Sequence, residues 1–478
     1  MNSLKNSSPP ATLSLKEALS WALAAIGCFQ VAFLSNLLGF ALVGYFAALL
    51  NLRRVSSGPS AFGWGFLVGY ANAAIGSAFF YNIFDVGALV LWGVLALFSG
   101  LLVLGLHVIQ KRWGGGWALL WAPILWLGLE WLRAEGYYLR FSWLSPGYVF
   151  ANSPQSHVLM RLGLYTFGAI LMALTAVTFR VPGMARLMAV AFLTFGLFLL
   201  SNLPTVTFGL KDTTSATTIR VTGLHLESTG SEAIIEALDR ARSEHPETDI
   251  YILGEYTFST TPMDAVKAWC RSNNAYLIGG GAQFYEAGEY ENTAWVVDPN
   301  GAIPFSQVKS VPIQFFDDGR PAEAQRVWDS PWGPIGIAIC YDLSFRKVMD
   351  AYVAQGAQAL LIPSREDVSW GAQQFSQHAR VAPIRSSEYR IPVARVGAQR
   401  TDAQICDGDG RILAAVSHRE AGAILSSEIA LAGPGRVPVD RWLGPLALLA
   451  SIVLALALVA QRVARERKPK PPTPAPNQ

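Results

Sequence analysis

The chain has 478 residues, of which 52% are hydrophobic and 15% are charged, whereas soluble domains carry about 25% charged residues. The charge is uneven: 12 of the 193 residues 18–210 are charged, against 49 of the 230 residues 211–440. This division excludes a wholly soluble protein and an all-membrane transporter. The formal net charge of +3 also conceals a net charge of −9 in residues 211–440, so no nucleic-acid partner is expected.

The first 210 residues contain seven apolar stretches that are long enough to predict membrane spans, since about 20 apolar residues cross a bilayer. An eighth lies near 442–459, and the first seven lie near 17–35, 37–52, 60–80, 86–109, 115–133, 158–179 and 185–203. The first stretch continues into the second without a small-residue cleavage site, so we expect it to remain in the mature protein rather than to be a signal peptide.

The basic residues between these stretches predict how the chain is oriented, because short cytoplasmic loops are enriched in Lys and Arg. With eight spans, the following all fall on one side: Lys5, Lys16, Arg53, Arg54, Lys111, Arg112, Arg180, Arg186, Arg462, Arg465, Arg467, Lys468 and Lys470. That side is expected to be the cytoplasm. The predicted organisation is a membrane domain (1–210), an outward-facing domain (211–440), a last span (441–461) and a basic, Pro-rich cytoplasmic tail (462–478).

Three residues near the outer end of the fifth span are candidates for a substrate portal. Glu130 and Arg133 are expensive to place in lipid unless they are paired or functional. Their simpler interpretation is an interfacial pair one turn apart, and Trp143 is either a residue of the interfacial aromatic belt or part of the portal. The sequence leaves these alternatives open.

Between residues 218 and 430, short apolar runs alternate with helical stretches, which predicts an α/β fold. Residues 250–253 are expected to form a buried strand that ends at Glu255. A carboxylate just after such a strand lies where active sites of α/β folds usually form. Position alone is weak evidence, because Glu255 could also be a solvated loop residue.

A second buried strand, 334–339, is followed by Cys340, Tyr341 and Asp342 and then by a predicted helix near Ser344. A thiol at a strand-to-helix corner lies beside backbone N–H groups that can stabilise a thiolate or an oxyanion. Lys309 lies between Glu255 and Cys340 in the sequence, in a mostly apolar segment of a domain that has few lysines.

These segments resemble known motifs. LGEY (253–256), the Lys309 segment and GIAICYD (336–342) are similar to the Glu-Lys-Cys triad motifs of the nitrilase superfamily of carbon-nitrogen hydrolases. Together with the spans, residues 126–148 and 377–396 resemble the apolipoprotein N-acyltransferase family. The resemblance implies an α plus α/β fold class: a transmembrane helical domain of about eight spans, with an αββα nitrilase-like sandwich inserted before the last span.

The resemblance also implies a ping-pong acyl transfer in the bacterial inner membrane, with the catalytic domain on the periplasmic side and no metal or organic cofactor. Cys340 would be the nucleophile, Glu255 its general base, and Lys309 with the Tyr341 N–H the oxyanion donors. The implied partners are a phospholipid acyl donor, a diacylated lipoprotein acceptor and membrane lipid.

The sequence departs from the family at several points. Lys309 is followed by SVPIQFFDD, in which Asp317 takes the place of an expected supporting Glu, and the strand after the nucleophile reads IPSREDVSW. These changes keep two alternatives open: a membrane-anchored amidase or acyltransferase for another amine, and a catalytically silent lipid-binding relative.

His378 could suggest the catalytic histidine of a Cys-His protease. Nothing else of such a protease is present in the sequence, so we interpret His378 as structural.

Overall fold

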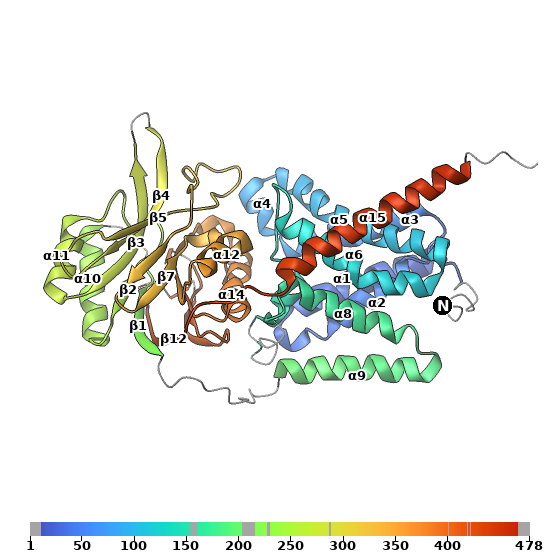
Figure 1. Ribbon diagram of the computed structural model, residues 1–478, viewed down its shortest axis with the longest axis horizontal. Coiled ribbons are helices and arrows are strands. Elements are labelled where there is room, and N and C mark those ends of the chain that lie inside the picture. Colours follow the sequence, from blue (N-terminus) through green and yellow to red (C-terminus); the bar gives the residue numbers. More distant parts are fainter. Residues whose placement is uncertain are drawn as a thin grey trace, which may run out of the picture.

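The computed structural model describes residues 11–151, 153, 160–202, 216–226, 230–285, 288–399, 401–417, 419–420 and 422–466. It consists of a helical half and an α/β half that lie side by side, and the last helix returns along the helical half (Figure 1). The expected domain boundary near residue 210 and the Pro-rich tail from Lys468 lie outside the described residues.

The apolar stretches of the N-terminal half fold as helices: α1 (Leu15–Leu34), α2 (Ala41–Leu52), α3 (Gly58–Gly76), α4 (Phe79–Phe84), α5 (Gly87–Trp113), α6 (Gly115–Glu135), α8 (Leu164–Thr178) and α9 (Gly183–Asn202). The stretch expected at 60–80 is divided into α3 and the short α4. The division falls at Ser77, whose hydroxyl group donates to the Ala73 carbonyl over 2.6 Å and so competes with continuation of the helix.

Within the part of the chain that the structure describes, three helices are long and apolar enough to cross a membrane: α1, α5 and residues Asp440–Ala464 of α15 (Asp440–Glu466). Shorter apolar helices of 10–17 residues are Ala41–Leu52, Leu164–Thr178 and Gly183–Leu199. The structure therefore supports a helical domain of membrane character.

Helices α3 and α5 approach closely because glycines face the contact. A Cβ atom on Gly69 would lie 2.9 Å from the Cα atom of Ala96, and one on Gly65 would lie 2.5 Å from the Ser99 carbonyl oxygen. Small residues at helix interfaces allow close backbone approach within a membrane, where burial of apolar surface gives little driving force. This packing positions the α4–α5 segment that faces the α/β half.

The α/β half contains two six-stranded sheets. The first has the order β12 (Ile424–Leu431), β1 (Thr217–Leu224), β2 (Ile250–Ile252), β3 (Tyr276–Phe284), β4 (Tyr290–Val297) and β5 (Phe305–Val308). The second has the order β11 (Ile412–Val416), β10 (Ala403–Cys406), β9 (Val393–Gln399), β8 (Ala359–Glu366), β7 (Gly333–Ile337) and β6 (Val327–Ser330). Strands β1, β2 and β3 pair in parallel, as do β7, β8 and β9, so their carboxyl ends meet at one edge of each sheet.

The two sheets pack face to face through branched apolar side chains, among them Ile250, Ile278, Ile337 and Leu361, all fully buried. Helices cover the outer faces: α10 (Ser231–Glu244) and α11 (Asp264–Asn273) on the first sheet, and α12 (Arg346–Ala354) and α14 (Val381–Tyr389) on the second. The predicted two-sheet sandwich with helices on both outer faces is confirmed.

The two halves are joined by buried polar contacts. The Arg346 guanidinium lies 2.9 Å from the Asp440 carboxylate at the start of α15, and the Leu164 N–H donates to the Glu388 carboxylate over 2.7 Å. On α13 (Ala372–Ala379), the Gln373 amide donates to the Ile75 carbonyl over 2.8 Å. These contacts hold the helical half against the part of the sandwich that carries Cys340.

Candidate active site

Cys340 sits on a sharp turn after strand β7. Its φ angle of +48° lies in the left-handed region, which is uncommon for a residue with a side chain, and the chain continues directly into a 3-10 turn at Cys340–Ser344. The side chain is almost fully buried, and the thiol donates a 3.4 Å hydrogen bond from Sγ to the Arg365 carbonyl oxygen. The fold thus presents this thiol in a fixed direction at the carboxyl end of a parallel strand.

Glu255 follows strand β2 on the facing sheet. A Cβ atom on the preceding Gly254 would lie 2.4 Å from the Ala398 backbone nitrogen, so only glycine allows the two sheets to approach here. The Glu255 N–H donates to the Ser364 carbonyl oxygen over 3.1 Å. Its carboxylate is buried and receives a 2.7 Å hydrogen bond from the Asn292 amide.

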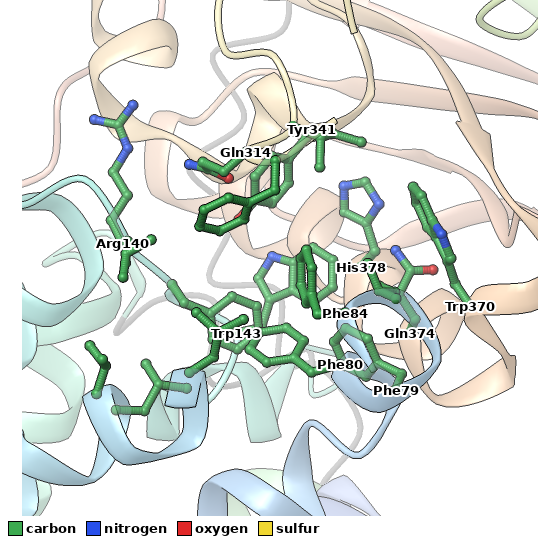
Figure 2. Close-up of a pocket in the computed structure, with 18 of the residues that line it drawn as sticks. Phe79, Phe80, Phe84, Arg140, Trp143, Gln314, Tyr341, Trp370, Gln374 and His378 are labelled. Carbon is green, nitrogen blue, oxygen red and sulfur yellow. The ribbon is translucent and has the colours of Figure 1, made fainter. Parts of the chain in front are cut away.

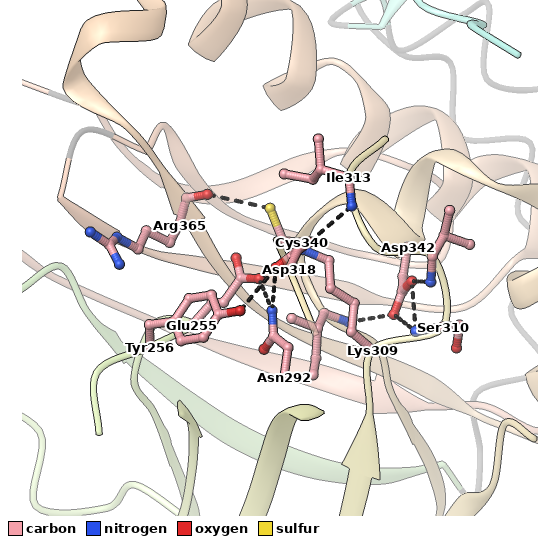
Figure 3. A network of polar contacts seen from close by, with 12 residues as sticks. Glu255, Tyr256, Asn292, Lys309, Ser310, Ile313, Asp318, Cys340, Asp342 and Arg365 are labelled. Carbon is pink, nitrogen blue, oxygen red and sulfur yellow. Dashed lines mark hydrogen bonds and ion pairs between the residues drawn. The ribbon is translucent and has the colours of Figure 1, made fainter. Parts of the chain in front are cut away.

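Lys309 follows strand β5 and is fully buried. Its Nζ atom lies 2.9 Å from Glu255 Oε1 and 2.6 Å from Asp318 Oδ2, so one ammonium group joins two carboxylates (Figure 3). Asp317, the carboxylate that we expected to support Lys309, is exposed instead. The expectation is corrected to its neighbour Asp318, which is buried beside Lys309. Asp318 is also held by the Tyr256 hydroxyl at 2.9 Å.

Burial, aided by the negative charge of Glu255, keeps the Cys340 thiol protonated at rest. Burial raises the pKa of Cys340 well above its usual value, and the negative charge of Glu255 adds to this effect. Burial lowers the pKa of Lys309, but the charges of Glu255 and Asp318 outweigh burial and raise the pKa of Lys309 well above its usual value. The cluster therefore combines a neutral thiol with a cation, and a thiol in this setting would have to lose its proton in order to act as a nucleophile.

Asp342 fixes the turn rather than facing substrate. Its carboxylate accepts hydrogen bonds from the backbone N–H groups of Ile339, Ser310 and Val311 at 3.1, 3.0 and 2.7 Å. These bonds tie the segment after Lys309 to the turn that carries Cys340. Burial raises the pKa of Asp342 to about 6.

An apolar pocket of about 820 Å³, part of it open to solvent, lies between Cys340 and the helical half. Its lining includes Phe79, Phe80, Phe84, Leu91, Val94, Leu95, Phe141, Trp143, Phe315, Tyr341 and His378 (Figure 2). The predicted portal residue Trp143 is buried here, with its indole N–H donating to the Ser344 hydroxyl over 3.0 Å. Aromatic and aliphatic walls around a nucleophile suit an acyl chain.

A second, polar cavity lies next to the first. It is lined by Glu255, Lys309 and Asp318 together with the exposed Asp317, and residues Ile83, Ile313 and Trp370 line both cavities. Glu255 and Lys309 thus face the polar cavity, while Cys340 faces the apolar pocket. The thiol therefore stands at the boundary between a polar and an apolar environment.

Glu130 and Arg133 do not reach this site. They line a separate cavity inside the helical half, with the Arg133 guanidinium 3.9 Å from the Glu130 carboxylate and 3.2 Å from the Ser145 hydroxyl. Both are buried, because α6 packs between other helices rather than at an open surface. The portal interpretation of these two residues is corrected to an internal polar cluster.

Two residues of the site were not singled out from sequence, and a third was singled out but interpreted as structural. Asn292 is a buried polar residue within β4, and only its place in a hydrophobic strand could have marked it. Phe80 belongs to an apolar run with no distinguishing pattern. His378, interpreted as structural, lines the Cys340 pocket. Within the described ranges, no group of three or more His, Cys, Asp or Glu residues is arranged to hold a metal ion.

Comparison with known proteins gives two family matches. A carbon-nitrogen hydrolase model matches residues 245–438, and a model described as the apolipoprotein N-acyltransferase N-terminal domain matches residues 18–177. The two matched segments contain most of the sandwich, including its Cys340 site, and most of the helical half. Neither segment alone covers half of the chain.

The curated relatives match less than a third of this chain. Omega-amidase NIT2 of Mus musculus is 27% identical over 145 residues, covering 28% of this chain and 50% of that protein. Omega-amidase NIT2 of Homo sapiens is 27% identical over 154 residues, covering 30% of this chain and 54% of that protein. The chain therefore spans about half of the length of the curated relatives it matches.

Two solved structures each cover 45% of this chain. Nit3 of Saccharomyces cerevisiae, a member of branch 10 of the nitrilase superfamily, has 18% identity and a TM-score of 0.40, covering 45% of this chain and 93% of its own. A carbon-nitrogen hydrolase of Helicobacter pylori G27 also has 18% identity and a TM-score of 0.40, covering 45% of this chain and 90% of its own.

Proposed function

We propose that this chain, which belongs to the apolipoprotein N-acyltransferase family, transfers a fatty acyl group from a phospholipid to the amino terminus of a diacylated lipoprotein through a thioester on Cys340. The observation that carries the proposal is the position of Cys340. Its thiol lies between the buried Glu255–Lys309 pair and an apolar pocket that the helical half completes. A small-amide hydrolase has no need of such a pocket.

In the first half-reaction, the Cys340 thiol attacks the ester carbonyl of the phospholipid. Glu255 takes the thiol proton and returns it to the departing lysophospholipid alcohol, so that a C–S bond replaces a C–O bond. Lys309 Nζ and the Tyr341 N–H stabilise the oxyanion, each donor contributing about 3 kcal/mol in comparable sites. The Lys309 ammonium group does not have to move far in this step, because it is held between the carboxylates of Glu255 and Asp318.

In the second half-reaction, the amine of the lipoprotein attacks the thioester carbonyl, an amide forms and the Cys340 thiol is released. Both lipid substrates keep their acyl chains in the membrane, which avoids a cost of about 0.8 kcal/mol for each CH₂ group exposed to water. The apolar pocket opens between α4, α5 and the sandwich, which supports entry from the helical half.

For localisation, we propose a multi-pass protein of the bacterial inner membrane with about eight spans and the sandwich on the periplasmic side. The distribution of basic residues supports this orientation: Arg53, Arg54, Lys111 and Arg112 all follow spans on the side opposite the sandwich. An impermeant maleimide should label a cysteine introduced at Asp329, on exposed β6, in intact spheroplasts, and should label one at Lys111 only after lysis. The reverse pattern would overturn the orientation.

The test of function uses purified full-length protein in phosphatidylethanolamine vesicles with a diacylglyceryl-cysteine peptide. The proposal predicts a peptide mass increase of one acyl group with wild type and none with Cys340→Ala. Release of free fatty acid without peptide acylation would favour hydrolysis, and wild type without either product would favour a catalytically silent relative.

A further inference from the structure

A buried charged cluster lies on the sandwich beside the Cys340 pocket. Glu366 at the end of β8 has its Oε1 atom 2.7 Å from His378 Nδ1 and 2.9 Å from Arg395 Nη2. All three side chains are at most 1% exposed. The mechanism described above uses none of them.

The hydrogen-bond pattern defines the state of the histidine. Arg395 and His378 hold the pKa of Glu366 below its usual value although burial opposes this, so Glu366 is a carboxylate and can only accept hydrogen bonds. Arg395 Nη2 also lies 2.9 Å from His378 Nδ1, but a lone pair on Nδ1 would face the Glu366 carboxylate at 2.7 Å. We therefore assign the proton to Nδ1 and the lone pair to Nε2. Within the described residues, Nε2 is buried and has no hydrogen-bond partner.

That lone pair belongs to a side chain that lines the Cys340 pocket. The imidazole stacks on Trp143 with ring centroids 4.9 Å apart and planes 19° apart, and it meets Tyr341 edge-on at 6.4 Å (Figure 2). Tyr341 directly follows the nucleophile. An unsatisfied buried nitrogen costs about 1–3 kcal/mol, so this wall, whose other polar side chains include Arg140, Gln314 and Gln374, gains nothing from Nε2 unless a ligand group binds there.

The position of His378 complements that of Glu255. Glu255 lines the polar cavity and its Oε1 atom is already bound by Asn292 and Lys309. His378 lines the apolar pocket, which Glu255 does not line. A group that can accept a proton therefore lies on each side of Cys340: Glu255 in the polar cavity and His378 in the apolar pocket.

We propose that His378, oriented by Glu366, is the base that accepts the proton of the acceptor amine in the second half-reaction. This rests on the proposed function. As the amine nitrogen forms the C–N bond to the thioester carbonyl, its N–H proton moves to His378 Nε2. As the C–S bond breaks, the imidazolium returns that proton to the Cys340 thiolate, so no external acid or base is required. Glu366 stabilises the transient imidazolium through Nδ1.

The surroundings of His378 keep its resting imidazole uncharged. Burial, with the nearby charge of Arg395, lowers the pKa of His378 to about 4, although Glu366 acts in the opposite direction. The imidazole is therefore neutral at physiological pH. A neutral base with a fixed tautomer is suited to an amine whose N–H becomes acidic only while the C–N bond forms.

The experiment separates the two half-reactions in single turnover. Full-length enzyme is first acylated with phosphatidylethanolamine, and the acyl-enzyme is then mixed with the diacylglyceryl peptide. His378→Gln should form the acyl-enzyme at close to the wild-type rate but transfer the acyl group at least 100-fold more slowly. Glu366→Gln should also slow acyl transfer more than acyl-enzyme formation, but by a smaller factor than His378→Gln. His245→Gln, which is outside both cavities, should match wild type.

Equal slowing of both half-reactions in His378→Gln, or an unchanged transfer rate, would overturn the inference. If His378→Gln does not fold, as judged by thermal unfolding, Glu366→Gln decides by the same criterion. Wild type that forms no acyl-enzyme would overturn the proposed function instead, so the two failures are distinguishable.

Discussion

Lys309 Nζ lies 2.6 Å from Asp318 Oδ2, closer than its 2.9 Å contact with Glu255. Asp318 is one residue beyond the carboxylate that the spacing after Lys309 indicates. It is further fixed by the Ile313 N–H at 3.0 Å and by Asn292 at 3.0 Å. Asp318 therefore positions Lys309, which under the proposed function stabilises the oxyanion, while Asp317 remains exposed at the rim of the polar cavity.

The adjacent carboxylates provide a matched pair of variants. Asp318→Asn removes the negative charge from the closest partner of Lys309 and should reduce the rate of acyl-enzyme formation by 100-fold or more, as loss of an oxyanion donor does. Asp317→Asn should stay within about threefold of wild type, because its side chain is in solvent. Single-turnover acylation measures both rates. A larger loss in Asp317→Asn would restore the original assignment.

Lys309 is also expected to stabilise the fold. Lys309→Met leaves Glu255 and Asp318 buried without a cation, and breaking a buried pair in this way costs about 3–5 kcal/mol. Adding Asp318→Asn should recover part of the lost unfolding temperature without recovering activity. Thermal unfolding in detergent measures the change in stability, and acylation rates of the same variants measure the activity. Equal unfolding temperatures in the single and double variants would contradict the pairing.

The apolar pocket should set the length of the transferred chain. Val94→Trp on α5 adds volume to the pocket wall and should shift the preference toward shorter acyl chains. Leu97→Trp, on the same helix but exposed, is the control and should keep the wild-type preference. Competition between phospholipids of different chain length, read as product masses, measures the shift. No change in Val94→Trp would place the acyl chain elsewhere.

The lowered pKa of His378 predicts a pH dependence of stability. The folded pKa of about 4 lies below the ordinary value of 6.5, so the unfolded chain binds more protons between these values. This contribution is present above pH 6.5 and is lost as the pH falls to 4, amounting to at most about 3 kcal/mol. His378→Gln should therefore show a smaller fall in unfolding temperature over this window. An identical fall would show that His378 is not buried in its neutral form.

The placement of Glu255 and Cys340 was accessible from sequence because each follows a buried parallel strand, and the carboxyl ends of such strands meet. The position of Asp318 could not be predicted from the sequence, because the segment between Lys309 and β6 is a loop. The loop includes Phe315 at φ +70° and Gly319 at φ +77°, and these local reversals, which no periodicity encodes, decide which of two adjacent aspartates turns inward.

The helical half shows the same limit. Apolar stretches gave the positions of its helices, because continuous hydrophobicity is a local property. They did not show that Glu130 faces other helices, since the rotation of α6 depends on its neighbours. The contacts of His378 were not predicted for a related reason: its partners Glu366 and Arg395 lie on strands β8 and β9, and their contact with α13 is visible only in three dimensions.

The central claim is a fatty-acyl thioester on Cys340. The most direct test is the intact mass of full-length protein after incubation with phosphatidylethanolamine alone, followed by addition of the diacylglyceryl peptide. We predict one added acyl mass, removable by hydroxylamine, located on Cys340 by peptide mapping, and transferred to the peptide in the chase. An unmodified protein that nevertheless acylates the peptide, or an adduct on another residue, would contradict the account.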